Sequence, residues 1–199
     1  MRRSSLRIAC FAAALLLVRP AQARADFFFV PFAGIKFGGS TSIVDLDRAA
    51  SKKALTLGGA AIRLSNSVFG YEVEFGSVTG YFEDDDSGLI KPGSYVVDLT
   101  GNVMLSLPPG ATGGGLRPYV VAGGGLIHAE AEDIYEVLQV RRTVPAVTVG
   151  AGAVGLITNN VGVRFDLRHL RSLSKDASSG QVGRRIAYSR FTLGLLLRF

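Results

Sequence analysis

The chain has 199 residues, of which 48% are hydrophobic and only 19% are charged. Five of its 22 Lys and Arg residues, but none of its 16 Asp and Glu residues, lie within the first 25 positions. The remaining chain therefore carries 17 basic against 16 acidic residues, and this near-neutral balance gives no support to nucleic-acid binding.

The first 25 residues have the layout of a secretory signal peptide. A basic start precedes an apolar run of 11 residues, 8–18, which is too short to cross a bilayer as a helix. Ala23 and Ala25 form a small-residue cleavage site, so we expect cleavage before Asp26. This division predicts a signal peptide at 1–25 and a single mature domain at 26–199.

Residues after position 25 read as strands. They show no convincing helical periodicity, but period-2 alternation recurs between clusters of Gly, Pro, Asn and Asp. Eight strands are predicted, at 27–38, 54–65, 68–82, 94–107, 116–128, 144–158, 161–171 and 186–199. About ten residues suffice for a tilted strand to cross a membrane. Since the only cysteine, Cys10, precedes all eight, neither a disulfide nor thiolate chemistry is expected among them.

The predicted connections alternate between long and short. Long ones are expected at 38–53, 83–93, 129–142 and 172–184, with tight turns at 66–67 and 159–160 and a medium, small-residue connection at 108–115. Long connections at one end and short ones at the other are typical of an up-and-down barrel that spans a membrane. Both termini of such a barrel would lie at the short-turn end, which would face the periplasm.

Alternation alone fits two barrels, one with a ligand inside and one with lipid outside. Aromatic residues near strand ends favour lipid, because rings sit well at membrane–water interfaces. These aromatic residues are Phe69, Tyr71, Tyr81, Tyr95, Tyr119, Tyr188, Phe191 and Phe199. The sequence therefore predicts an all-β, eight-stranded antiparallel up-and-down transmembrane β-barrel.

The opposite strand faces carry charges of both signs, which suits a narrow interior filled by side chains. We expect these charges to pair inside the lumen, because buried charges require partners. The predicted lumen network comprises Glu72, Glu74, Asp98, Arg164, Asp166, Arg168 and Arg190. The facing of the first two strands is less clear, although Lys36 is expected to point inward.

The segment 26–199 resembles the small outer-membrane β-barrel family of Gram-negative bacteria, the group of the OmpA transmembrane domain and OmpX. Leu116–Leu126, "LRPYVVAGGGL", is similar to a strand common in that family. The final "TLGLLLRF" resembles the family's C-terminal insertion signal, through Thr192, Gly194, Leu197 and Phe199. The resemblance implies that the outer-membrane assembly machinery recognises this strand. The resemblance covers the barrel alone and does not extend to a peptidoglycan-binding domain.

Two motifs that could suggest cofactors or metals have plainer interpretations. Gly150–Gly155, "GAGAVG", matches a dinucleotide fingerprint, but strand, turn and strand follow where the chemistry needs a helix. The acidic run Glu83–Asp86 lacks calcium-loop spacing, because the twelfth position from Asp84 is Tyr95 rather than Glu. It could bridge divalent ions to lipopolysaccharide phosphates, but we assign no cofactor and no metal site.

The two histidines give little support to catalysis. Some outer-membrane barrels modify lipid A, and the deacylases among them have a His-x-Ser arrangement. Here Ser172 follows His169 by three positions, which puts the two side chains on opposite faces of a strand, whereas nucleophilic catalysis needs them within hydrogen-bond reach. His128 has Glu130 two residues on, but no neighbouring Ser. No catalytic residue is therefore assigned.

The leading interpretation is a non-enzymatic outer-membrane barrel in which four long extracellular loops carry a structural or surface-interaction role. A narrow pore for small solutes and a lipid-A-modifying enzyme remain as alternatives. The expected partners are outer-membrane lipid, lipopolysaccharide and the assembly machinery, with no nucleic acid, and the chain is expected to be a monomer.

Overall fold

The computed structural model of the protein describes residues 26–41, 52–64, 68–81, 94–112, 115–132, 139–173 and 186–199. Its eight strands are β1 (Asp26–Thr41), β2 (Ala54–Leu64), β3 (Phe69–Thr79), β4 (Tyr95–Ser106), β5 (Arg117–Glu132), β6 (Gln139–Leu156), β7 (Val161–Ser172) and β8 (Ile186–Arg198). One short helix, α3 (Pro109–Thr112), lies between β4 and β5. The predicted signal peptide, its cleavage site and the acidic run at 83–86 lie outside the described residues.

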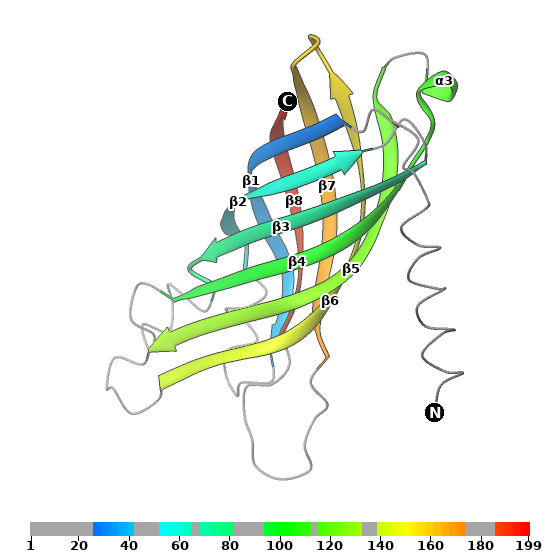
Figure 1. The fold of residues 1–199 in the computed structure, drawn as a ribbon. Coiled ribbons are helices and arrows are strands. Elements are labelled where there is room, and N and C mark those ends of the chain that lie inside the picture. The colour runs from blue at the N-terminus through cyan, green and yellow to red at the C-terminus, as the bar shows by residue number, and fades with distance from the viewer. Residues whose placement is uncertain are drawn as a thin grey trace, which may run out of the picture.

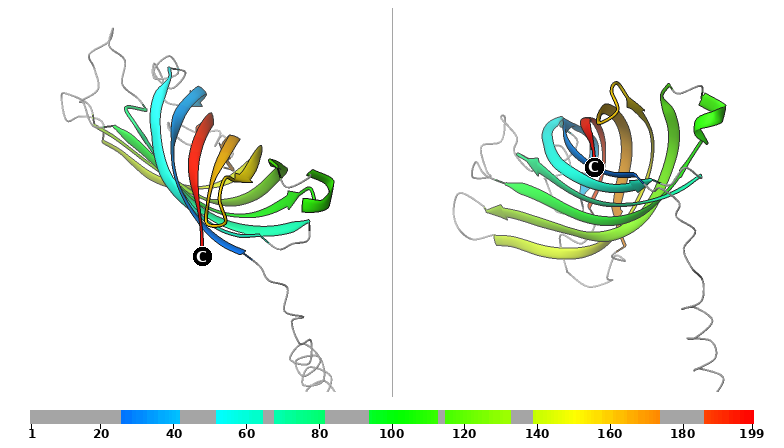
Figure 2. Two further views of the ribbon diagram at one scale, coloured as in Figure 1. Left: turned by 90° about the horizontal axis from the view of Figure 1, so that it is seen from above. Right: turned by 45° about the horizontal axis from the view of Figure 1, so that its top comes forward.

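The strands form one closed antiparallel barrel. Each strand pairs with its neighbours in the chain, and β8 pairs with β1. Figures 1 and 2 show the strands tilted and wrapped around a common interior. The predicted all-β, eight-stranded antiparallel up-and-down fold is confirmed. Among the described residues, no helix has the length and apolar composition needed to cross a bilayer.

Both ends of the described chain lie at the same end of the barrel. The backbone N–H of Phe199 donates to the carbonyl of Phe27, so the last strand finishes beside the first. The short connections after β2, β4 and β6 are at this end, as is α3 (Figure 1). We call it the short-turn end and the opposite one the long-connection end.

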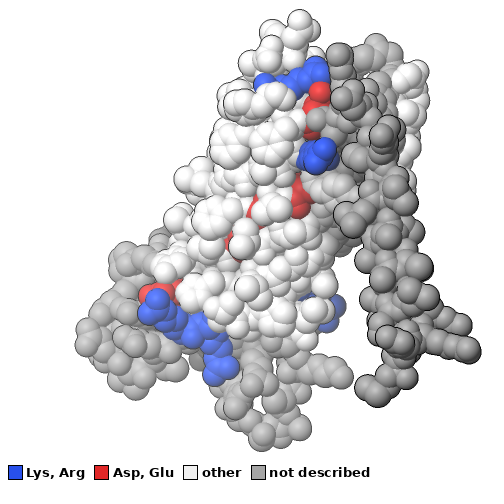
Figure 3. Space-filling view, in the orientation of Figure 1, with Lys and Arg blue, Asp and Glu red and all other residues white. Residues whose placement is uncertain are grey.

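The outer surface of the barrel is apolar. In β8, Phe191, Leu193 and Leu195 face outward and are 43–52% exposed, whereas the alternating Arg190 and Thr192 face inward and are at most 4% exposed. Figure 3 shows a mostly uncharged outer surface, with Lys and Arg mainly toward the two ends of the barrel and some Asp and Glu atoms visible in the middle. An apolar outside around a charged inside is the arrangement of a barrel whose solvent is lipid.

Two apolar clusters occupy the lumen, one toward each end. Toward the long-connection end, Val78, Ile127, Leu170 and Tyr188 belong to one buried cluster. Toward the short-turn end the second cluster is formed by Phe28, Val30, Ala60, Ile62, Leu64, Met104, Tyr119, Val121, Val154 and Leu196. Lys36 is fully buried, which confirms that it faces inward. Buried apolar side chains thus occupy the lumen toward both ends of the barrel.

The β5–β6 hairpin is longer than the sequence predicted. Ala129 pairs with Arg142 and Glu130 with Arg141, so most of the connection expected at 129–142 is strand. β7 pairs with β6 only from Ala146 onward, so the hairpin projects at the long-connection end. The prediction of a long loop was wrong here, because outward positions of the projecting part carry charged residues such as Glu130 and Arg141 instead of the apolar column of a lipid-facing strand.

The seam between β1 and β8 is less regular than the other strand pairings. The pairing runs through Phe28–Phe29 and resumes at Phe32, leaving out Val30 and Pro31; proline has no N–H to donate to the ladder. A bulge follows between Phe37 and Ser40, where Gly38 has a φ of 59°, a left-handed conformation that favours glycine.

Candidate functional site

The charged layer at the centre of the lumen is the most distinctive feature of the described structure. All the residues that the sequence assigned to a lumen network face inward, and each is at most 2% exposed: Glu72, Glu74, Asp98, Arg164, Asp166, Arg168 and Arg190. They come from four strands, β3, β4, β7 and β8. The layer lies between the two apolar clusters of the lumen.

Arg168 joins three carboxylates in this layer. Its Nη1 lies 2.6 Å from Glu72 Oε1 and 3.0 Å from Glu74 Oε1. Its Nε donates to Asp166 Oδ1 over 2.7 Å. Because both glutamates are on β3 and Asp166 is on β7, this guanidinium ties opposite walls of the barrel together.

Arg164 and Arg190 complete the layer on either side. Arg164 pairs with Glu72 and, at 2.9 Å, with Asp166. Arg190 pairs with Glu74 and, at 2.7 Å, with Asp98. Three guanidinium groups are therefore shared among four carboxylates, which supplies the partners that buried charges require.

Inward glycines make room for these large side chains. A Cβ atom at Gly76 would lie 2.1 Å from Arg190 Nη1 and 2.6 Å from Asp98 Oδ2, and one at Gly152 would lie 2.4 Å from Tyr119 Oη. Residues Gly150–Gly155 lie wholly within β6, where Gly150 packs against the side chain of Arg168. The glycines of the "GAGAVG" motif thus serve close packing in the barrel wall.

Three tyrosines that the sequence placed at the rims belong to the lumen instead. Tyr81, Tyr119 and Tyr188 are at most 3% exposed, so the prediction of interfacial rings was wrong for them. Tyr119 accepts a hydrogen bond from Arg164 Nε (2.7 Å), and Tyr188 donates to Asp98 Oδ2 (2.8 Å). Tyr119 in β5 and Tyr188 in β8 occupy positions that the period-2 alternation places on the inward face. That alternation was the signal that could have assigned them correctly.

A small pocket opens at the short-turn end of the lumen and goes no further than the apolar cluster there. Its volume is about 250 Å³, and its floor includes Phe28, Leu64 and Leu196. At its rim, Arg198 Nη2 donates to Asp26 Oδ1 over 2.6 Å. This pocket is therefore a recess lined in part by the apolar cluster at the short-turn end.

A polar cluster lies on the outside of the β5–β6 hairpin. Tyr95 donates to Glu130 Oε2 over 2.8 Å, and Arg141 Nε lies 3.5 Å from the same oxygen. Glu130 lies beyond the apolar band of the barrel. The hydrogen bond from Tyr95 holds the pKa of its carboxyl group below the usual range. Arg141 stays 75% exposed despite this contact, so its charge remains available to solvent or to headgroups.

The two histidines lie near the long-connection end and face outward. His128 Nδ1 is 2.8 Å from Thr143 Oγ1, but its Nε2 is 3.7 Å from Glu130, beyond hydrogen-bond distance. His169 Nδ1 is 3.0 Å from Ser189 Oγ, a contact that the sequence did not suggest. Ser172, in contrast, is buried on the opposite face. Among the residues that the structure describes, neither imidazole is hydrogen-bonded to both a hydroxyl and a carboxylate, as a catalytic triad requires.

The residues assigned to the C-terminal signal all lie in or next to β8. Thr192 is buried in the lumen, whereas Phe199 is 79% exposed. Gly194 faces inward near Val30, and Leu197 pairs with Phe29 and Val161 across both neighbouring strands. The last strand therefore presents an apolar column to lipid and a smaller, more polar face to the lumen.

Solved structures with a similar fold include outer-membrane proteins. Neisserial surface protein A has a TM-score of 0.63 with 15% identity, covering 87% of this chain and 97% of its own. OprG from Pseudomonas aeruginosa has a TM-score of 0.59 with 14% identity, covering 88% and 96%. The chain has the fold of the small outer-membrane β-barrels. No protein-family model and no curated protein sequence matches it.

A third structure of this fold was solved with a bound anion. Ail, the attachment invasion locus protein of Yersinia pestis, in complex with the heparin analogue sucrose octasulfate, has a TM-score of 0.53 with 16% identity, covering 88% of this chain and 99% of its own. At such identities the likeness concerns the fold alone, and the chemistry must be argued from the residues of this chain.

Proposed function

We propose that this chain is a closed, non-enzymatic protein of the outer membrane whose activity lies at its surface-exposed end. The observation that carries the proposal is the packing of the lumen, in which a charged layer is enclosed between two apolar clusters. A solute path would have to cross all three layers. The fold thus acts as a rigid support, and we assign surface interactions to the projecting β5–β6 hairpin and to the long connections at 42–51, 82–93 and 174–185.

Conductance tests the closed lumen. Purified, folded protein inserted into planar bilayers should give no discrete current steps, because ion pairs and apolar side chains fill the lumen. A porin inserted in the same bilayer is the positive control. Reproducible single-channel steps from this protein alone would contradict the proposal and favour the alternative of a narrow pore.

Exposed arginines near the long-connection end favour a first partner, the anionic lipopolysaccharide of the surrounding leaflet. Arg141, Arg142 and Arg171 are exposed near the long-connection end, and Arg171 lies on the outward face of β7 between Val147 and Ala187. Basic side chains at this height are well placed for phosphate groups, each worth about 1 kcal/mol near a charged membrane surface. Sucrose octasulfate bound to Ail is a precedent for anionic sugars on this fold.

Binding of purified lipopolysaccharide to the folded protein in detergent tests this partner. Changing Arg141 and Arg171 together to Gln should weaken binding by about tenfold or more, because each arginine contributes about 1 kcal/mol near an anionic surface. Arg117→Gln, at the other end of the barrel, is the matched control and should bind as the parent does. Equal binding by all three proteins would remove the rim arginines from the proposal.

A further inference from the structure

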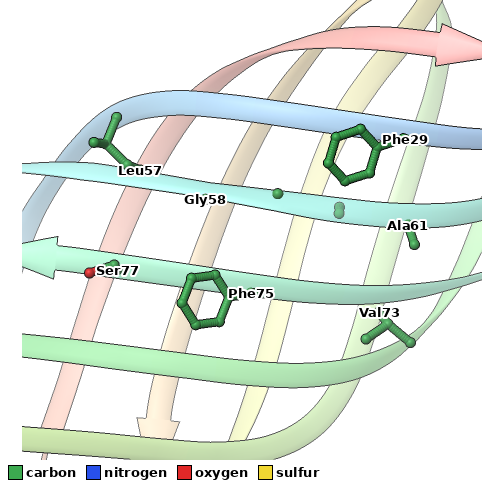
Figure 4. Close-up of a pocket in the computed structure, with 9 residues that line it drawn as sticks. Phe29, Leu57, Gly58, Ala61, Val73, Phe75 and Ser77 are labelled. Carbon is green, nitrogen blue, oxygen red and sulfur yellow. The ribbon is translucent and has the colours of Figure 1, made fainter.

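A shallow apolar groove runs over the outside of β1, β2 and β3. Its volume is about 540 Å³, and its lining includes Phe29, Leu57, Gly59, Ala61, Val73 and Phe75. Figure 4 shows the rings of Phe29 and Phe75 on either side of β2, with only small residues of that strand between them. The groove therefore lies on the surface that faces lipid.

The groove exists because two outward positions of β2 carry small residues. Gly59 lies between Pro31 and Phe75, and Ala61 lies between Phe29 and Val73. Phe29, Val73 and Phe75 are 46–57% exposed and stand as walls. A Cβ at Gly59 would meet nothing closer than 3.7 Å, the ring of Phe29, so a larger side chain would fit there without disturbing the barrel.

An arginine stands at the short-turn side of this groove. Arg63 follows Ala61 by two residues on the same outward face of β2, about 7 Å along the strand, and lies between Phe27 and Tyr71. It is exposed and has no ion pair or hydrogen bond with any described residue. It is also the single charged residue among the outward strand positions described in the short-turn half.

We propose that the groove and Arg63 together bind one membrane phospholipid, with an acyl chain along Gly59 and Ala61 and the phosphate on the guanidinium. Flanking aromatic rings mark the height of the interface, where arginine side chains reach headgroups. In the orientation of the proposed function, on which the choice of leaflet rests, this is the periplasmic leaflet.

Charge complementarity favours a lipid over a second copy of the chain. No Asp or Glu occupies an outward strand position in the described short-turn half, so a copy docked on this face would bring no carboxylate to Arg63. A phospholipid brings both the acyl chain that fits the groove and the phosphate that arginine binds well.

Native mass spectrometry of the folded protein with added phosphatidylglycerol tests the site. The parent should retain one lipid, and Arg63→Gln should lower retention by about fivefold, the effect of one basic residue at a membrane surface. Gly59→Leu, which fills the groove but keeps Arg63, should lower it as well. Lys53→Gln, which removes an exposed cation next to the other end of β2, is the control and should retain the lipid as the parent does.

The possible outcomes separate the occupants. A heat-dependent gel shift first shows that each variant has folded. Equal retention by the parent, Arg63→Gln and Gly59→Leu overturns the proposal, and so does a dimer in the parent that Gly59→Leu abolishes, which would make a second copy the occupant. Neither the bilayer conductance nor lipopolysaccharide binding enters this test, so its failure is distinct from failure of the proposed function.

Discussion

Arg164 shows how a single side chain is held in the lumen. It is 2% exposed and contacts Glu72, Asp166 and the hydroxyl of Tyr119. A guanidinium is always charged and carries several donors in a fixed plane, so it can satisfy groups on three strands at once. Removal of this one cation would leave the buried carboxylates of Glu72 and Asp166 short of a partner.

Arg164→Leu should therefore destabilise the barrel strongly. The expected loss in the free energy of unfolding is about 3–5 kcal/mol, as for breaking a buried ion pair from one side. Denaturant titration of the protein in lipid vesicles measures it. Arg171→Leu, an exposed outward position on the same strand, is the matched control and should change stability little; equal stability of both variants would show that Arg164 has no part in a stabilising network.

At the scale of elements, the seam between β1 and β8 carries the termini. The ladder omits Val30 and Pro31, but the ion pair between Arg198 and Asp26 (2.6 Å) holds the short-turn end together. The rings of Phe27 and Phe199 lie 6.3 Å apart at the same place. The last residues of β8 thus close the barrel, and they are also the residues that the family resemblance assigns to insertion.

These two roles of the C-terminus can be separated. Because Phe199 is 79% exposed, Phe199→Ser should refold into lipid vesicles almost as well as the parent. If the residue is read by the assembly machinery, the same variant should reach the outer membrane of cells several-fold less. Phe69→Ser is the control, since Phe69 is 60% exposed at the same end of the barrel. Equal losses in cells would assign the effect to the lost ring and not to a signal.

At the scale of the whole molecule, closure of the sheet satisfies every strand through its neighbours. In hydrocarbon no water is present to bond a free strand edge, so a closed barrel is the only stable all-strand solution. The charged layer adds ties between opposite walls, such as Arg168 between β3 and β7. The barrel should therefore open as one cooperative unit.

Gel mobility measures this unit directly. Protein extracted from membranes should migrate differently on SDS gels before and after boiling, because the closed barrel resists the detergent until it is heated. The shift should persist in Gly59→Leu, whose added side chain faces outward into the groove. Recovery of the protein only in a soluble fraction, with no shift on boiling, would contradict a membrane barrel.

The sequence by itself determined the strand number, the barrel and the side that faces lipid. Period-2 alternation assigns each residue of a strand to one of two faces, and apolar columns such as the one from Phe191 to Leu195 show which face is outside. The same parity pointed Arg164 and Arg190 inward. The projecting β5–β6 hairpin was missed, because beyond the lipid the outward positions, such as Glu130 and Arg141, are charged and form no apolar column.

Only the tertiary structure decided which side chains meet. Strand register sets Gly76 beside Asp98, and the curvature of the barrel brings Arg190 across to both; neither follows from one strand's pattern. Tyr119 and Tyr188 were assigned to the rims because an aromatic near a strand end has two uses, at the interface or in the lumen. Likewise, the groove beside Arg63 depends on three adjacent strands, whose combined surface no single stretch of sequence contains.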